Sequence, residues 1–160
     1  MTLWAGRESP LAWMLSSEQL CAHIGVDSTV WRRFASHWEQ LAPDSYAAEL
    51  GVERLRRYGH FAYTAAADGS ARLLPHGVFS QPENSNPLYI GRDRVFEPLT
   101  EAFATDPLLH RLLGWLGGVA TVLDDVAEWS AKVTPFRVLS GADGVGDPTP
   151  EGLHRDESRW

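Results

Sequence analysis

The sequence of 160 residues has little cysteine, little lysine and no long apolar stretch. Cys21 is the single cysteine, which excludes disulfide bonds within the chain and any zinc or iron–sulfur site made of several thiolates. Lys132 is the single lysine, so no polybasic segment is present that would bind anionic lipid. The longest uncharged apolar stretch, 112–123, contains glycines and is shorter than the roughly 20 residues that cross a bilayer. We therefore expect a protein that does not enter a membrane.

The charge balance also excludes a class of partner. The chain has 21 acidic and 14 basic residues, which gives a net charge of −7, whereas nucleic-acid binding depends largely on an excess of lysine and arginine. Hydrophobic residues make up 44% of the chain, an ordinary value for one globular domain. The first twenty residues contain Arg7, Glu8 and Glu18, so they lack the apolar core of a signal peptide. We expect a cytoplasmic protein.

The first half of the chain predicts two helices. Residues 1–27 are weakly patterned, and we expect an N-terminal extension there, followed by a single domain over 28–160. A helix is predicted after the capping residue Asp27, because apolar residues then recur at spacings of three and four up to Pro43. A second helix is predicted from Asp44 to about Leu55. The residues that carry the first pattern are Trp31, Phe34, Trp38 and Leu41.

The pattern then changes to strands and back to helices. Residues 58–66 and 72–81 predict a β-hairpin, with Asp68-Gly69 as its turn. A short helix is predicted around Phe96 to Phe103, and a longer one from Asp106-Pro107 to the glycine pair Gly117-Gly118. Strand residues return over 127–139. The order of helices, hairpin, helices and strand predicts an α+β fold.

Six histidines are present, and most are expected to be structural, because one hydrogen bond satisfies a neutral imidazole. His60 and His76 lie on the two predicted hairpin strands and could face each other, which is a weak indication of a metal site. His154 differs because Asp156 stands two residues after it. On an extended strand both side chains leave the same face, and they would supply two of the three ligands of a 2-His-1-carboxylate iron site.

The order His154-Arg155-Asp156 also occurs in the catalytic loop of kinases. That interpretation fails here because no asparagine follows and no glycine-rich phosphate loop precedes it. A third interpretation, an unrelated α+β binding domain with a chance His-x-Asp, stays open.

The surroundings of the pair are more specific. Residues 148–156 read Pro-Thr-Pro-Glu-Gly-Leu-His-Arg-Asp, after a Trp-containing strand and a Gly/Asp-rich loop. This segment resembles the small bacterial 2-oxoglutarate/Fe(II) dioxygenases that hydroxylate free amino acids, such as isoleucine dioxygenase. Phe79-Ser80-Gln81 and Arg94-x-Phe96 look similar to the upstream part of that family. The resemblance covers residues 28–156.

The resemblance implies a double-stranded β-helix (jelly-roll) core with N-terminal helices, and His154 and Asp156 as ligands of Fe(II), with 2-oxoglutarate as co-substrate. Members of the family have a second histidine ligand and an arginine for 2-oxoglutarate further along the chain, and neither is in this sequence. We therefore expect an incomplete domain that lacks the C-terminal half of its barrel. Such a domain would expose open sheet edges, through which it could self-associate.

Three further residues are candidates for substrate binding: Gln81 in an Asn/Pro-rich loop, Arg137 on the last predicted strand, and Glu151 just before the motif. Arg137 could meet a substrate carboxylate if it points into the barrel, or it could lie at the surface. The expected activity is hydroxylation of a free amino acid or a similar small molecule. The alternative is a non-catalytic jelly-roll remnant that binds a small molecule or a protein.

Overall fold

The computed structural model describes residues 14–65, 69–80, 93–124 and 126–140. Helices and strands both occur in these residues, which confirms the predicted α+β class. In chain order the elements are α1 (Ser17–Ile24), α2 (Ser28–Ala35), the 3₁₀ helix η1 (Ser36–Gln40), β1 (Ala42–Pro43), α3 (Ser45–Ala48), β2 (Arg54–Arg56), β3 (Gly59–Thr64), β4 (Ser70–Leu73), α4 (Glu101–Ala104), α5 (Pro107–Leu123), β5 (Glu128–Val133) and β6 (Phe136–Val138).

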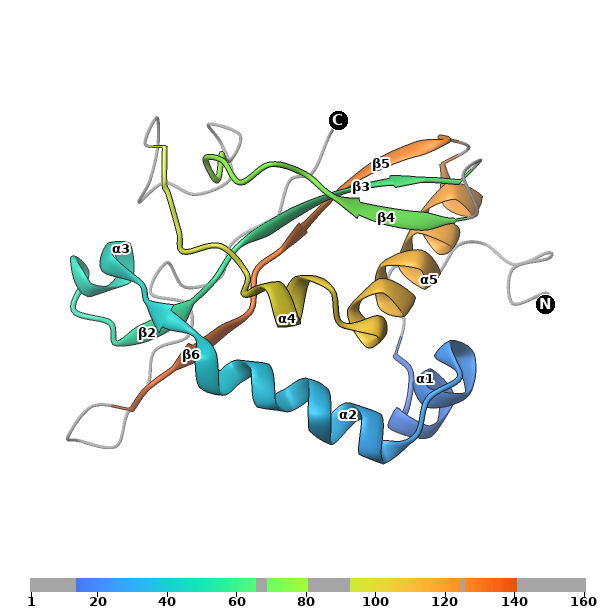
Figure 1. Ribbon diagram of the computed structural model, residues 1–160, viewed down its shortest axis with the longest axis horizontal. Helices are drawn as coiled ribbons and strands as arrows, with labels where there is room; N and C mark the ends of the chain where they lie inside the picture. Colours follow the sequence, from blue (N-terminus) through green and yellow to red (C-terminus); the bar gives the residue numbers. More distant parts are fainter. Residues whose placement is uncertain (1–13, 66–68, 81–92, 125, 141–160) are drawn as a thin grey trace.

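Within the described residues the strands form two antiparallel sheets, with the orders β1-β2-β6 and β4-β3-β5. The pairing of β2 with β6 and that of β3 with β5 keep the same register. Between them, the N–H of Arg57 donates to the carbonyl of Pro135. Residues 54–64 and 128–138 therefore form one continuous two-stranded ribbon that runs through both sheets (Figure 1).

One face of this ribbon is covered by helices. Successive residues of a strand point to opposite faces, and in β3 the buried Phe61 and Tyr63 point towards α5. Helices α2, α4 and α5 lie on this side of the ribbon (Figure 1). We call it the helix-covered face. The main core there consists of Ile24, Phe34, Phe61, Ala71, Leu99, Phe103, Ala104, Leu108, Leu109 and Leu113.

The helix predicted from Asp27 towards Pro43 is confirmed, as α2 followed directly by η1. Oδ1 of Asp27 accepts the N–H groups of Thr29 at 2.8 Å and Val30 at 3.1 Å, so it satisfies two of the amides that a helix leaves unpaired at its start. Phe34 lies on the inner side of this helix and is buried. The sequence pattern and the capping residue agree here, and the element forms as predicted.

The helix predicted from Asp44 to Leu55 is wrong beyond its first turn. Asp44 does cap α3, but Gly51 has a φ of 75°, in the left-handed region that ends a helix. Residues 54–56 then form β2, and Nε of Arg54 donates to Oδ2 of Asp44 at 2.9 Å. The strand forms because it pairs with β6, a partner far along the chain that local periodicity does not reveal.

The predicted end of the next long helix at Gly117-Gly118 is also wrong, because α5 continues to Leu123. Gly117 packs against the ring of Tyr63, where a Cβ would lie 2.6 Å from ring atoms. The glycine thus permits a close approach of α5 to β3 and does not end the helix. Among the described residues, no helix is both long enough and apolar enough to cross a membrane.

The predicted hairpin is confirmed, with Gly69 at a φ of 69° between β3 and β4. Its second strand is shorter than predicted and ends at Leu73. The helix predicted around Phe96 to Phe103 is reduced to α4, which Thr100 caps. The strand predicted over 127–139 is present as β5 and β6.

Helix α1 lies within the predicted extension 1–27 and packs against α5. Nη1 of Arg111 donates to the carbonyl of Gly25 at 2.7 Å, and the ring of His23 stacks on Trp115 with 6.0 Å between centroids. Ile24 at the end of α1 belongs to the main core. The division of the chain at residue 27 stays a prediction.

Candidate functional site

The side of the ribbon opposite the helices carries polar residues. Residues that pair directly across antiparallel strands lie on the same face, so the register places side chains of β3, β4 and β5 together. We call this the polar face. It consists of His60, Ala62, Thr64, Arg72, Glu128, Ser130 and Lys132. The helix-covered face of the same strands carries Phe61, Tyr63 and Ala71, all buried.

His60 lies on the polar face opposite Lys132 of β5. Its Nε2 lies 2.5 Å from Oγ of Ser130, and Nζ of Lys132 donates to the carbonyl of Ser80 at 2.6 Å. Partial burial lowers the pKa of His60, and the positive charge of Lys132 lowers it further. Burial also lowers the pKa of Lys132. His60 is therefore neutral at pH 7 and can both accept and donate a hydrogen bond.

A cavity of about 440 Å³ opens on this face. His60, Arg72 and Ser130 line it, together with Asp124 and Glu128 near the start of β5. It therefore has cationic, anionic and neutral polar groups, and its volume is within the range of small-molecule sites. Chemically, such a lining suits a small polar molecule.

Further along the ribbon, arginines pack against aromatic rings. Phe79 and Phe96 are buried beside Tyr58. The guanidinium of Arg56 lies 4.3 Å from the centroid of Phe96, and that of Arg94 lies 5.0 Å from the centroid of Phe79. Arg94 is only 3% exposed. A guanidinium over a ring is a favourable electrostatic contact, and more so away from water.

This arginine–aromatic cluster brings together two motifs that the sequence separates. The N–H of Phe79 donates to the carbonyl of Arg94 at 2.7 Å, so the described residues of the two motifs, Phe79 and Arg94 with Phe96, meet over the ribbon. Asp44, buried at the end of β1, accepts from Nε of Arg54 at 2.9 Å and lies 4.0 Å from Nη1 of Arg56. The cluster is thus fixed to β2 by ion pairs and by ring contacts.

Four of the five predicted site residues, Gln81, Glu151, His154 and Asp156, lie outside the described residues. The fifth, Arg137, lies in β6 opposite Leu55. That register places it on the helix-covered face, and its Nη1 donates to Glu39 of η1 at 3.2 Å. The structure therefore does not bring Arg137 to the polar face, and its part in substrate binding stays a prediction.

The predicted pairing of His60 with His76 does not form a metal site. Both rings lie near Tyr58, with centroid distances of 6.4 Å and 6.3 Å, but His60 is engaged with Ser130. Among the described residues, no group of three His, Cys, Asp or Glu side chains is placed to hold a metal ion. The described part of the chain therefore does not supply an iron site by itself.

Comparison with known proteins decides the family. A family model described as 2OG-Fe dioxygenase matches residues 35–160, which includes the ribbon, the polar face and the His-x-Asp motif. The chain belongs to the 2OG-Fe dioxygenase family. Membership implies Fe(II) as cofactor and 2-oxoglutarate as co-substrate. No curated protein matches the sequence significantly.

A solved structure is similar to this chain in sequence and in fold. It is the crystal structure of a bsmA homolog from Methylobium petroleophilum PM1, which is 34% identical to this chain with a TM-score of 0.75. The match covers 87% of this chain and 55% of the other. The chain thus spans about half the length of the structure that it matches.

Reasoning from the sequence missed His60, Ser130 and Lys132 as neighbours on one face. One signal was available, since residues 59–64 alternate between His60, Ala62 and Thr64 on one side and Phe61 and Tyr63 on the other. What it could not supply is the register against β5, which places Ser130 and Lys132 beside His60.

Proposed function

We propose that the chain is part of a non-haem Fe(II)- and 2-oxoglutarate-dependent hydroxylase that acts on a free amino acid or a similar small molecule. The observation that carries the proposal is the family match over residues 35–160, which contains His154 and Asp156. In this proposal those two residues bind the iron, and Gln81 and Glu151 contact the substrate. Arg137, predicted from the sequence for the same role, pairs with Glu39 on the helix-covered face and is not included. Iron bound there would supply the oxygen activation that hydroxylation requires.

We further propose that the ribbon belongs to a double-stranded β-helix. Two features support this fold. The ribbon runs continuously through both sheets, and helices cover one of its faces while polar side chains occupy the other. The remaining strands of a jelly roll would pack over the polar face and place it inside the barrel.

Inside such a barrel the residues of the polar face would bind and orient. Neutral His60, paired with Ser130, can hydrogen-bond a carboxylate or an amine of a small molecule. Lys132 brings a positive charge from the same face, which favours a carboxylate. These side chains would hold the bound small molecule in one orientation beside the iron.

A non-catalytic binding domain is the second candidate. It is favoured by one observation, the cavity of about 440 Å³ on the polar face, which His60, Arg72 and Ser130 line and which could hold a small molecule without a metal. In that case the polar face would bind a small molecule or a protein without any reaction.

Anaerobic titration of Fe(II) distinguishes the two candidates. We expect weak one-to-one binding that His154→Ala and Asp156→Ala both abolish, because a histidine and a carboxylate two residues apart form only part of the ligand set. His23→Ala, on α1, serves as the matched control and should bind as the wild type does. Equal binding by all four proteins would refute the assignment of the two ligands. Succinate release after addition of 2-oxoglutarate and O₂ then tests for turnover.

A further inference from the structure

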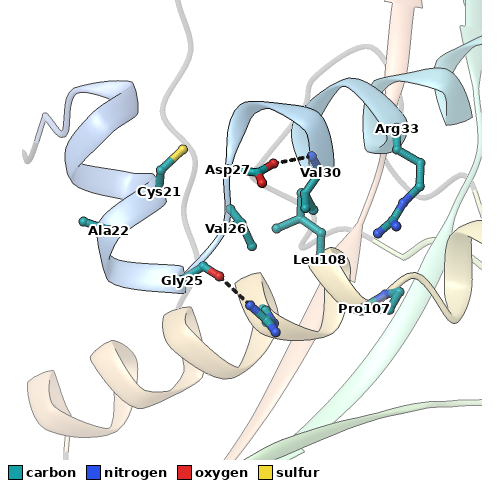
Figure 2. A pocket seen from close by; sticks show the side chains of 10 residues that line it. Cys21, Ala22, Gly25, Val26, Asp27, Val30, Arg33, Pro107 and Leu108 are labelled. Carbon is teal, nitrogen blue, oxygen red and sulfur yellow. Dashed lines mark hydrogen bonds between the residues drawn. The ribbon is translucent and has the colours of Figure 1, made fainter.

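A second cavity lies on the other side of the sheet from the polar face, between α1, α2 and α5. Figure 2 shows it from close by, with the end of α1 and the start of α2 above α5. Its volume is about 580 Å³. Neither the family nor the proposed function assigns a role to it, and none of its lining residues belongs to the polar face.

Part of the wall of this helical cavity is apolar. Val26 and Val30 line it from the start of α2, and Leu108 lines it from the first turn of α5. Leu108 is fully buried in the main core, so the half-buried Val26 and Val30 supply the accessible apolar surface. Such a wall suits a short aliphatic group.

Two arginines bring positive charge to the cavity. Nη1 of Arg111 donates to the carbonyls of Gly25 at 2.7 Å and Ile24 at 3.3 Å, which leaves further N–H donors on its guanidinium. Arg33 is exposed, and within the described part of the chain its guanidinium has neither a hydrogen bond nor an ion pair. In Figure 2 its side chain extends from α2 towards the start of α5.

Two acidic groups lie at or near the cavity. Oδ1 of Asp27, which also lines the cavity, accepts the N–H groups of Thr29 and Val30. Asp106 is buried and accepts from His37, and the charge of Arg33 is among the influences that lower its pKa. Of the lining residues, two are cationic and one is anionic. Asp106 lies outside the lining, and His37 and the N–H of Leu108 already hold its carboxylate. The net charge of the lining residues is thus one positive charge, which favours an anion of a single charge.

We propose that this helical cavity binds a small monocarboxylate with a short branched aliphatic chain. The planar guanidinium of Arg33 matches the two oxygens of a carboxylate, and the aliphatic part would pack against Val26 and Val30. Arg111 contributes positive charge from the opposite wall. Because three helices line the cavity, an occupant would connect α1 to α2 and α5.

Cys21 provides a direct test, since it lines the same cavity and is the chain's single cysteine. The probe is 4-methylpentanoate, and the readout is the rate at which iodoacetamide alkylates Cys21. At about ten times its Kd a ligand leaves about one site in eleven empty, so alkylation should slow about tenfold. The neutral 4-methylpentanamide should give no protection, and inorganic phosphate should give little.

Arg33→Gln should abolish the protection, whereas Arg32→Gln, its neighbour outside the lining, should keep it. Equal alkylation rates of the three proteins without ligand, and equal melting temperatures, would show that the substitutions leave the helices in place. The proposal is overturned if 4-methylpentanoate does not protect Cys21 of the wild type, or if the Arg33→Gln protein is protected equally. It is also overturned if the amide or phosphate protects as well as the carboxylate.

Discussion

The two faces of the ribbon are made by alternate residues of the same strands, yet one is apolar and buried and the other is polar. On the helix-covered face, Phe61 is fully buried and Gly117 of α5 touches the ring of Tyr63. On the polar face, His60 pairs with Ser130 beside a cavity. The strands thus supply stability on one side and chemical groups on the other. Substitutions on the two faces should therefore affect different properties.

The largest contrast is expected between two neighbours in β3. Phe61→Ala removes a fully buried ring and should lower the free energy of unfolding by about 3–5 kcal/mol. His60→Ala removes one partly buried hydrogen-bond partner and should cost about 1 kcal/mol. Chemical denaturation of both variants measures the difference. Equal losses would contradict the assignment of the core to one face only.

A second contrast lies within α5. Gly117→Ala places a methyl group against the ring of Tyr63 and should destabilise the protein by about 1–3 kcal/mol through overpacking. Gly118→Ala meets no atom within 4 Å and should stabilise it by about 0.5–1 kcal/mol, because alanine is the better helix residue. Thermal unfolding compares them. The account of the glycine pair fails if both changes have the same sign.

Local signals were sufficient for some elements and not for others. The cap at Asp27 and the apolar spacing predicted α2 and η1, and the turn at Gly69 predicted the hairpin. The strand β2 was missed, because Arg54 and Arg56 join a sheet through pairing with β6, which is far along the chain, and with the two-residue β1. The continuation of α5 was missed for a similar reason, since Gly117 is required by Tyr63 of a different element.

The candidate site likewise has one part that the sequence predicted and one part that it did not. The motif at His154 and Asp156 is contiguous, so it could be found from the sequence, and the family match over 35–160 agrees with the family that it suggested. The polar face depends on the register between β3 and β5. No property of the segment around His60 reveals that Ser130 will lie beside it.

On the helix-covered side, acid should remove the stabilisation that the Asp106 carboxylate gives. Burial alone would raise the pKa of Asp106, but hydrogen bonds from His37 and from the N–H of Leu108 outweigh it and lower the pKa. The stabilisation by the Asp106 carboxylate is thus complete above the aspartate pKa of the unfolded chain, about 3.9. It is lost as the pH falls through the lower pKa of the folded protein. Asp106→Asn should cost about 1 kcal/mol at pH 7.

Urea denaturation from pH 7 to pH 2 measures this dependence on Asp106. The wild type should exceed the Asn variant by a constant amount above about pH 5, and the difference should shrink below about pH 4. A difference that grows as the pH falls would have the wrong sign for a carboxylate with a lowered pKa.

The smallest expected effect is on the polar face. Because burial and the charge of Lys132 both lower the pKa of His60, Lys132→Met should raise that pKa towards its ordinary value. Arg72→Met, on the same face but not among the causes of the shift, is the control and should leave it unchanged. NMR titration of the imidazole resonances measures both. A lower pKa of His60 in the Lys132→Met protein would contradict the effect assigned to the charge of Lys132.

The central claim is that the polar face, and not the helix-covered face, looks towards the metal of this dioxygenase family. Paramagnetic broadening of NMR signals by a small amount of Mn²⁺, a substitute for Fe(II), tests it directly. We predict stronger broadening at His60, Ser130 and Lys132 than at Leu109 and Leu113 of α5, and loss of the effect in His154→Ala and Asp156→Ala. Broadening centred on α5, or unchanged in the two variants, would contradict the claim.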